Sequence, residues 1–239
     1  MTLRPCLNTA LTLPWTVLMS SLGVVAVASS GNVSVFRRLE RVWARGLVKS
    51  WGVSLEVHGG DHASASRPYI VVCNHQSLVD IPTLFLTLPM VPGFVAKQEL
   101  ARVPFLAAAL RAGGHVLIDR QSRKSAIESL DAAAAAIHAG LTVAIFPEGT
   151  RSETGSVGKF KTGGFHLAKK ALVPILPVGI RGTRAILPKK ALLLHPGHVE
   201  VRIGECIGVA DVERLPVKEL AELTRVRIAA LSGSPLASA

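Results

Sequence analysis

The sequence predicts an α/β fold in which a mostly parallel central sheet is flanked by helices and preceded by an N-terminal membrane-associated helical segment. Three features indicate this: short apolar segments typical of strands, helical patterns between them, and an uncharged N-terminal stretch. Strands separated by helices form parallel sheets, because each connection must cross over the sheet. The expected strands are residues 53–57, 69–72, 93–96, 115–118, 141–146, 173–179 and 199–203.

Two helices between and after these strands stand out. Residues 123–139 follow a plausible N-cap at Ser122 and end at Gly140, and residues 219–231 form the expected C-terminal helix. Length and composition fit one larger domain plus a short appendage, because 239 residues are 49% hydrophobic and only 18% charged. We therefore expect residues 1–52 to be the membrane-associated segment and residues 53–239 to be the α/β domain. The composition excludes a disordered chain.

The chain is basic, with 27 Lys and Arg against 16 Asp and Glu and a formal net charge of +11. Such a charge requires an acidic partner, either nucleic acid, an anionic membrane or a phosphorylated substrate. Aromatic residues make up only 5% and do not alternate with basic ones, which argues against a base-stacking surface. We therefore expect an anionic membrane surface and a phosphorylated substrate, and no nucleic acid. The three widely spaced cysteines indicate a reducing compartment.

The N-terminal stretch has no charged side chain between Arg4 and Arg37. Residues 11–28 are apolar enough to span or enter a bilayer, which takes about 20 residues. One proline, two serines and a glycine weaken a spanning helix, so a re-entrant or shallow segment is equally compatible with the sequence. The run also resembles a signal peptide with a cleavage site after residues 26–28, and this alternative would place the protein outside the cytoplasm.

The next segment has the pattern of an amphipathic helix. Cations and apolar residues fall on opposite arcs of a helical wheel, as expected for a helix at a membrane interface. The competing interpretation is a helix that packs on the protein core and exposes a solvated basic face. The basic arc is Arg37, Arg38, Arg41, Arg45 and Lys49, and the apolar arc is Phe36, Leu39, Trp43, Leu47 and Trp51.

Several catalytic signatures are absent from the sequence. It contains no GxSxG elbow, no HExxH, no GxGxxG after a strand and no GxxxxGK[ST]. These absences argue against four classes of enzyme: triad hydrolases, zinc proteases, dinucleotide enzymes and P-loop nucleotidases. We expect no metal and no cofactor.

Polar residues follow the second expected strand, in the segment NHQSLVD at residues 74–80. His75 and Asp80 would not face each other on one regular helix, but they can meet if His75 lies in the turn and Asp80 opens the following helix. A carboxylate on Nδ1 fixes the tautomer and leaves Nε2 free to take a proton. The alternative is an ordinary surface pair.

A second polar segment, FPEGTRS at residues 146–152, follows another apolar strand. Loops at the carboxyl ends of strands are the usual ligand sites of open α/β folds. Gly149 permits close backbone approach, Arg151 offers a planar fork suited to phosphate, and Thr150 adds a neutral donor. A plain Pro-Gly turn with a solvated arginine is the competing interpretation.

Together these segments resemble the 1-acyl-sn-glycerol-3-phosphate acyltransferase family, the glycerolipid acyltransferases with an HxxxxD motif. The first and third blocks of that family match residues 74–80 and 146–152, and the second and fourth match GHVLIDR at 114–120 and VPILPV at 173–178. The resemblance covers residues 53–208, with four blocks in order. It is specific for the superfamily and less so for the acceptor.

The resemblance implies direct transfer of a fatty acyl group from acyl-CoA or an acyl-carrier protein to the free hydroxyl of lysophosphatidate, giving phosphatidate. In this scheme His75 is the general base and Asp80 orients it. The phosphate-holding residues would be Lys97, Arg120, Gly149, Thr150 and Arg151, whereas Glu148 would order the loop or contact the acceptor glycerol.

The expected location is the cytoplasmic face of the cell inner membrane, either monotopic or with a single N-terminal span. Two alternatives for function stay open. One is the same chemistry on another lysolipid or on glycerol 3-phosphate. The other is a non-catalytic basic protein that binds membranes or nucleic acid.

Overall fold

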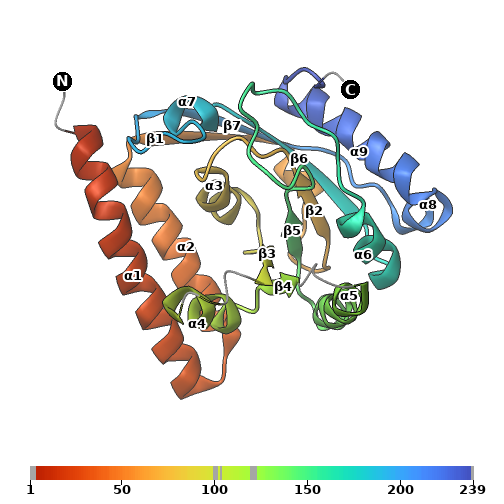
Figure 1. Cartoon of the computed structure of the whole chain (residues 1–239), viewed down its shortest axis with the longest axis horizontal. Helices are drawn as coiled ribbons and strands as arrows, with labels where there is room; N and C mark the ends of the chain where they lie inside the picture. The colour runs from red at the N-terminus through yellow and green to blue at the C-terminus, as the bar shows by residue number, and fades with distance from the viewer. Residues whose placement is uncertain (1–3, 99–101, 103, 119–122, 238–239) are drawn as a thin grey trace.

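A computed structural model describes residues 4–98, 102, 104–118 and 123–237, and it confirms the α/β fold. Seven strands of the described chain form one sheet in the order β1-β7-β6-β2-β5-β3-β4 (Figure 1). Every pairing is parallel except that of β6 with β7. The strands are β1 Val53–His58, β2 Ile70–Cys73, β3 Gly93–Lys97, β4 Val116–Ile118, β5 Val143–Ile145, β6 Ile175–Arg181 and β7 Gly197–Ile203.

Helices cover both faces of this sheet. The sequence predicted α5 and α9 closely, and it did not indicate the short helices α4, α6, α7 and α8. The helices are α1 Arg4–Ser30, α2 Val33–Ser50, α3 Asp80–Thr87, α4 Pro104–Ala112, α5 Arg123–His138, α6 Gly163–Ala171, α7 Thr183–Ile186, α8 Val209–Arg214 and α9 Val217–Ser232, with the 3-10 turn η1 at Gly60–His62.

Alternate residues of the central strands build two separate cores. In β2, Val71 and Cys73 pack with helices α2 and α3, while Ile70 and Val72 pack with α5, α6 and α9. This alternation follows from the period of two along a strand. All four β2 residues are fully buried, which explains why the strand is a continuous apolar run. The strand that delivers His75 is therefore held on both faces.

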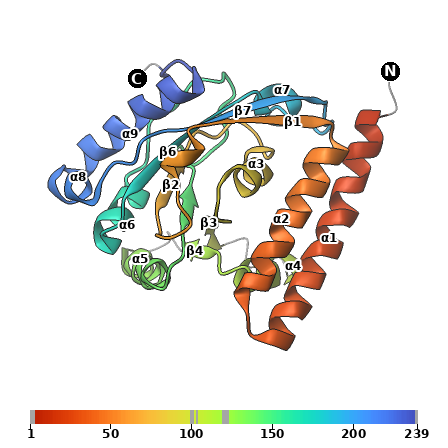
Figure 2. The same cartoon turned by 180° about the vertical axis from the view of Figure 1, so that it is seen from behind.

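Helices α1 and α2 form a long hairpin at the edge of the molecule opposite α9 (Figures 1 and 2). Their contact includes polar bonds, because the indole N–H groups of Trp43 and Trp51 donate to the hydroxyls of Thr16 and Thr12, each at 3.0 Å. The outer side of α1 leaves leucines such as Leu11 and Leu18 exposed. Within α1, residues Cys6–Ser30 form one segment long and apolar enough to cross a membrane. This supports membrane association weakly, and the boundary at residue 52 stays a prediction.

The predicted basic arc of α2 is only partly correct. Arg38, Arg45 and Lys49 are exposed, but Arg37 and Arg41 turn onto the α/β body. The Arg41 guanidinium donates to the carbonyl oxygens of Phe85, Leu88 and Pro89, at 3.2, 2.9 and 3.3 Å respectively. Carbonyl groups at the carboxyl end of a helix attract cations. The carbonyl groups that bind Arg41 belong to the end of α3 and to the residues that follow it.

Candidate active site

The turn between β2 and α3 carries the first polar segment. Asn74 fixes this turn to β6, because its amide donates to the carbonyl oxygen of Ile180 and its side-chain oxygen accepts from the Ile180 N–H, both at 2.8 Å. The next residue, His75, lies in the turn, and α3 begins at Asp80. This is the arrangement that allows residues five positions apart to meet.

His75 and Asp80 form a dyad. The distance from His75 Nδ1 to Asp80 Oδ2 is 2.8 Å, and Asp80 is fully buried. The same oxygen accepts the backbone N–H groups of Gln76 and Ser77, at 2.8 and 2.9 Å. A carboxylate at Nδ1 places the ring proton on that nitrogen, so Nε2 carries the free lone pair. The His75 side chain retains 15% exposure, so a substrate can reach it.

An aromatic stack holds the imidazole from the side. The ring of Phe146 stacks on His75 with centroids 4.0 Å apart and planes 14° apart, and Phe94 stacks on Phe146 at 5.6 Å. These contacts restrict the imidazole to one orientation. Phe146 belongs to the second polar segment, but sequence reasoning gave it no role. The available signal was an aromatic residue at the carboxyl end of an apolar strand, next to the polar segment.

The two polar segments are joined through Glu148. One oxygen of its carboxylate accepts the His75 N–H at 2.8 Å, and the other accepts the Gly158 N–H at 3.0 Å. The Ser152 N–H donates to the His75 carbonyl oxygen at 2.7 Å. Burial raises the pKa of Glu148, and the two backbone N–H groups partly offset that rise. Both carboxylate oxygens are thus used within the protein, which favours the loop-ordering role over contact with the glycerol.

The loop after Glu148 presents its remaining groups outward. Gly149 has a φ of +74°, a left-handed conformation that favours glycine, and the end of the Lys161 side chain lies close to it. Thr150 is exposed and Arg151 is half-buried. Within the part of the chain that the structure describes, the Arg151 guanidinium forms no hydrogen bond or ion pair. It is therefore available to an anionic ligand.

Two of the predicted phosphate-binding residues are not placed. Lys97 ends β3, but its side chain lies outside the described part of the structure, as does all of Arg120. Their roles stay predictions. Among the described residues no group of three His, Cys, Asp or Glu side chains could hold a metal ion.

Comparisons with known proteins identify the family. A family model described as "Acyltransferase" matches residues 54–181, which is more than half of the chain. The chain is 31% identical over 214 residues to the sheep (Ovis aries) 1-acyl-sn-glycerol-3-phosphate acyltransferase alpha, covering 88% of this chain and 74% of the relative. It is 33% identical over 177 residues to the Saccharomyces cerevisiae 1-acyl-sn-glycerol-3-phosphate acyltransferase, covering 73% and 58%. The chain belongs to the 1-acyl-sn-glycerol-3-phosphate acyltransferase family.

A solved structure of the same family has the same fold. The 1-acyl-sn-glycerophosphate acyltransferase PlsC from Thermotoga maritima superposes with a TM-score of 0.82 at 26% identity, and the match covers 97% of this chain and 95% of that one. The resemblance inferred from four short blocks therefore extends over nearly the whole chain, including the N-terminal helices.

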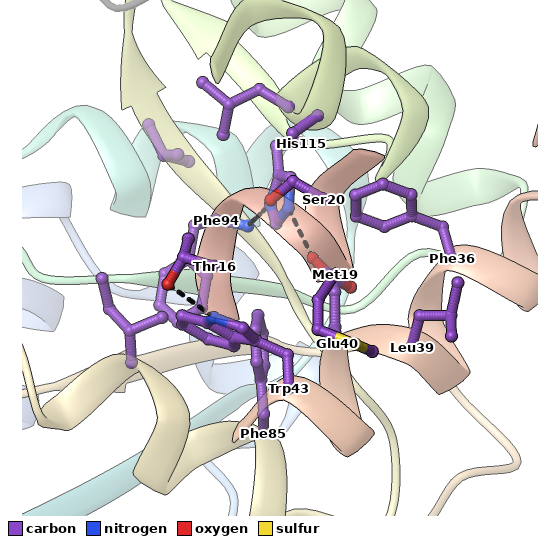
Figure 3. Close-up of a pocket in the computed structure, with 14 residues that line it drawn as sticks. Thr16, Met19, Ser20, Phe36, Leu39, Glu40, Trp43, Phe85, Phe94 and His115 are labelled. Carbon is purple, nitrogen blue, oxygen red and sulfur yellow. Dashed lines mark hydrogen bonds and ion pairs between the residues drawn. The ribbon is translucent and has the colours of Figure 1, made fainter. Parts of the chain in front are cut away.

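Two apolar cavities of this acyltransferase are lined by the aromatic rings that stack beside His75. The larger, about 420 Å³, lies between α1, α2, α3, α4 and β3 and is lined by Phe94. Figure 3 shows Glu40 and His115 in its wall, where His115 Nε2 donates to Glu40 at 2.8 Å. The smaller, about 320 Å³, is lined by Phe146, Gly149 and Lys161. The stacked rings of Phe94 and Phe146 thus contribute one wall to each cavity.

Proposed function

We propose that this enzyme transfers a fatty acyl group from a thioester to the free hydroxyl of 1-acyl-glycerol-3-phosphate, giving phosphatidate. The observation that carries the proposal is the 2.8 Å contact of His75 Nδ1 with the buried Asp80. It supplies a general base at the same sheet edge as Arg151, which has no hydrogen-bond or ion-pair partner among the described residues. The names of the relatives support the acceptor, and acyl-CoA or an acyl-carrier protein is the donor.

The chemistry follows from the dyad. His75 Nε2 takes the proton of the acceptor hydroxyl as its oxygen attacks the thioester carbonyl, and Asp80 stabilises the imidazolium that forms. When the tetrahedral intermediate collapses, the C–S bond breaks and the imidazolium returns the proton to the leaving thiolate. No acyl-enzyme and no cofactor are required. General-base catalysis contributes roughly 10²–10⁴-fold, so substrate positioning must supply much of the remaining acceleration.

Arg151 is the main phosphate ligand in this scheme. Its planar fork forms two parallel bonds with a phosphate, and the exposed Gly149 and Thr150 beside it allow close approach. Lys97 and Arg120 complete the basic pocket. The reaction brings together two acyl chains, one on each substrate, and the apolar cavities lined by Phe94 and by Phe146 offer space for them.

The enzyme works at the cytoplasmic face of the inner membrane in this proposal. The exposed apolar side of α1 enters the bilayer, and the exposed cations of α2 face anionic headgroups. Each basic residue near such a surface contributes about 1 kcal/mol of attraction. A lipid acceptor then reaches His75 without leaving the bilayer.

The test is an acceptor screen with wild type and His75→Ala. Purified protein is assayed with one acyl thioester against lysophosphatidate, other lysophospholipids and glycerol 3-phosphate. We expect wild type to acylate lysophosphatidate best and His75→Ala to lose nearly all activity while unfolding at the same denaturant concentration. His166→Ala, an exposed histidine on α6, is the matched control and should keep full activity. Preference for another acceptor, or an active His75→Ala variant, would overturn the proposal.

A further inference from the structure

The loop between α7 and β7 has an unusual composition for a water-facing surface. Its sequence, PKKALLLHP at residues 188–196, places two lysines before three leucines. Leu192 is 82% exposed and Leu193 is 40% exposed, whereas Leu194 is buried at 3%. Lys190 is 78% exposed at its side chain. The loop therefore presents two exposed leucines beside an exposed cation.

The structure holds this tip in place. The Ala191 N–H donates to the Pro188 carbonyl oxygen at 3.1 Å, and the His195 N–H donates to the Ile186 carbonyl oxygen at 3.0 Å, so the loop is closed at its base. Lys190 adopts a φ of +72°, a left-handed turn conformation that few lysines adopt. The exposed leucines are thus the tip of an ordered turn rather than part of a loose segment.

This loop adjoins the apolar helix α1. The Leu194 N–H donates to the hydroxyl of Thr9 at 3.2 Å, and both views place the loop beside the N-terminal end of α1 (Figures 1 and 2). Leu13, one turn after Thr9 on the same side of α1, is 70% exposed. The apolar surface of α1 therefore continues onto the loop past the end of the helix.

The start of this loop is bonded to the dyad turn, and its lysines pair with the residue that follows the second polar segment. The hydroxyl of Ser77, two residues after His75, donates to the Leu187 carbonyl oxygen at 2.8 Å. Glu153, two residues after Arg151, pairs with Lys189 and Lys190 at 3.1 and 3.4 Å. The position of the loop is thus coupled to both the dyad turn and the phosphate-binding loop.

We propose that residues 188–195 are a second membrane contact, in which Leu192 and Leu193 insert at the boundary between headgroups and acyl chains of an anionic bilayer. The lysines then lie at headgroup level. This rests on the membrane association in the proposed function and adds a contact beyond the N-terminal helices. Attachment at two separate places fixes the tilt of the α/β body and sets the opening beside His75 and Arg151 at the lipid surface.

A bilayer suits this surface better than a protein partner. Stable protein interfaces bury more than about 1,000 Å², which two leucine side chains cannot approach. A membrane needs only a few inserted apolar side chains with cations beside them. The adjoining α1 surface has the same apolar character, so one planar lipid surface accommodates both.

The first experiment places a polarity-sensitive fluorophore on the loop tip. Leu192→Cys is labelled in a background with Cys6→Ser and Cys206→Ser, because Cys73 is buried. The matched control is Val226→Cys on α9, a residue 48% exposed on the far edge of the molecule. Vesicles contain phosphatidylcholine and phosphatidylglycerol, with or without a headgroup-region quencher. We expect a blue shift and quenching at position 192 and neither at 226. Vesicle-bound protein with an unshifted label at 192 would overturn the proposal.

The second experiment separates the loop from the chemistry. Leu192→Asp is assayed with lysophosphatidate embedded in the same vesicles and with a short-chain lysophosphatidate dissolved in water. We expect kcat/KM to fall about tenfold on vesicles, because the variant can no longer insert a leucine at position 192 into the bilayer. In solution kcat/KM should stay unchanged, because no bilayer takes part. Equal rates for wild type and variant on vesicles would refute the loop contact. Inactivity of wild type on both substrates would instead refute the proposed function, and the labelling result would still decide the loop.

Discussion

The Glu148 carboxylate lies between two backbone N–H groups, and burial keeps its pKa above the ordinary 4.5. In the pH range between 4.5 and the raised pKa, the folded protein binds more protons at this group than the unfolded chain does. The contribution of Glu148 to the free energy of unfolding therefore falls as pH rises through that range.

Glu148→Gln removes this titration. Wild type and variant share all other titrating groups, so the difference between their free energies of unfolding reports on Glu148 alone. We expect this difference, wild type minus variant, to decrease as pH rises above 4.5. Denaturant unfolding at a series of pH values measures it. The variant should also lose activity, because an amide offers one acceptor oxygen for two N–H groups. A difference that stays constant with pH would show that burial does not raise the pKa of Glu148 in the folded protein.

In the proposed function, Arg151 binds the acceptor phosphate. Arg151→Ala should raise KM for lysophosphatidate by about 10–100-fold with a smaller change in kcat, because charge-assisted hydrogen bonds to phosphate are lost. The KM of Arg151→Lys should lie between those of wild type and Arg151→Ala, since lysine keeps the charge but not the planar fork of donors. The measurement is steady-state kinetics, with Arg227→Ala on α9 as an exposed arginine control. An unchanged KM would indicate that other cations bind the phosphate.

Sequence reasoning could anticipate the dyad but not its surroundings. The spacing of His75 and Asp80 allows contact only where a helix starts at the aspartate, and α3 starts there. The stacking of Phe146 and the bonds of Glu148 join segments more than seventy positions apart along the chain. Such contacts depend on which strands are neighbours in the sheet, here β2 and β5, and no local pattern encodes that.

Helices α2 and α3 are joined by apolar packing and by the hydrogen bonds of Arg41. Arg41→Ala removes hydrogen bonds to carbonyl oxygens at the carboxyl end of α3 and just after it, and we expect the free energy of unfolding to fall by about 1–3 kcal/mol. Denaturant unfolding measures this. Arg38→Ala, on the exposed side of the same helix, should change it by less than about 0.5 kcal/mol. Equal losses in both variants would mean that the α2–α3 contact does not depend on Arg41.

The strands were predictable because most are continuous apolar runs, and the sequence places all seven within a few residues of their observed ends. The antiparallel pairing of β6 with β7 was not predicted. A signal existed, since β7 alternates buried valines with the outward polar residues His198, Glu200 and Arg202, a pattern typical of antiparallel strands. The short helices lack such signals. Helix α6 begins with two glycines, and α7 spans four residues, so packing rather than local preference forms them.

The distribution of charge over the molecule matters more for membrane binding than its net value of +11. Cations occur at both edges of the sheet, and those of α2 and of the loop between α7 and β7 lie near the exposed leucines of α1, whereas those of α8 and α9 lie on the opposite edge. Attraction to a charged surface decays over about 10 Å at 0.1 M salt, so cations on the far edge contribute little. The hairpin edge should therefore dominate association with anionic vesicles.

Two triple variants with the same loss of charge test this directly. One replaces Arg38, Arg45 and Lys49 of α2 by Gln, and the other replaces Arg214, Lys218 and Arg227 of α8 and α9. At about 1 kcal/mol per cation, the α2 variant should partition onto phosphatidylglycerol-containing vesicles roughly a hundredfold less, whereas the α8–α9 variant should match wild type. Co-sedimentation at low salt measures both, and the gap should shrink as salt is added. Equal losses would mean that net charge alone directs the protein to the membrane, and that the α1–α2 hairpin has no preferred orientation there.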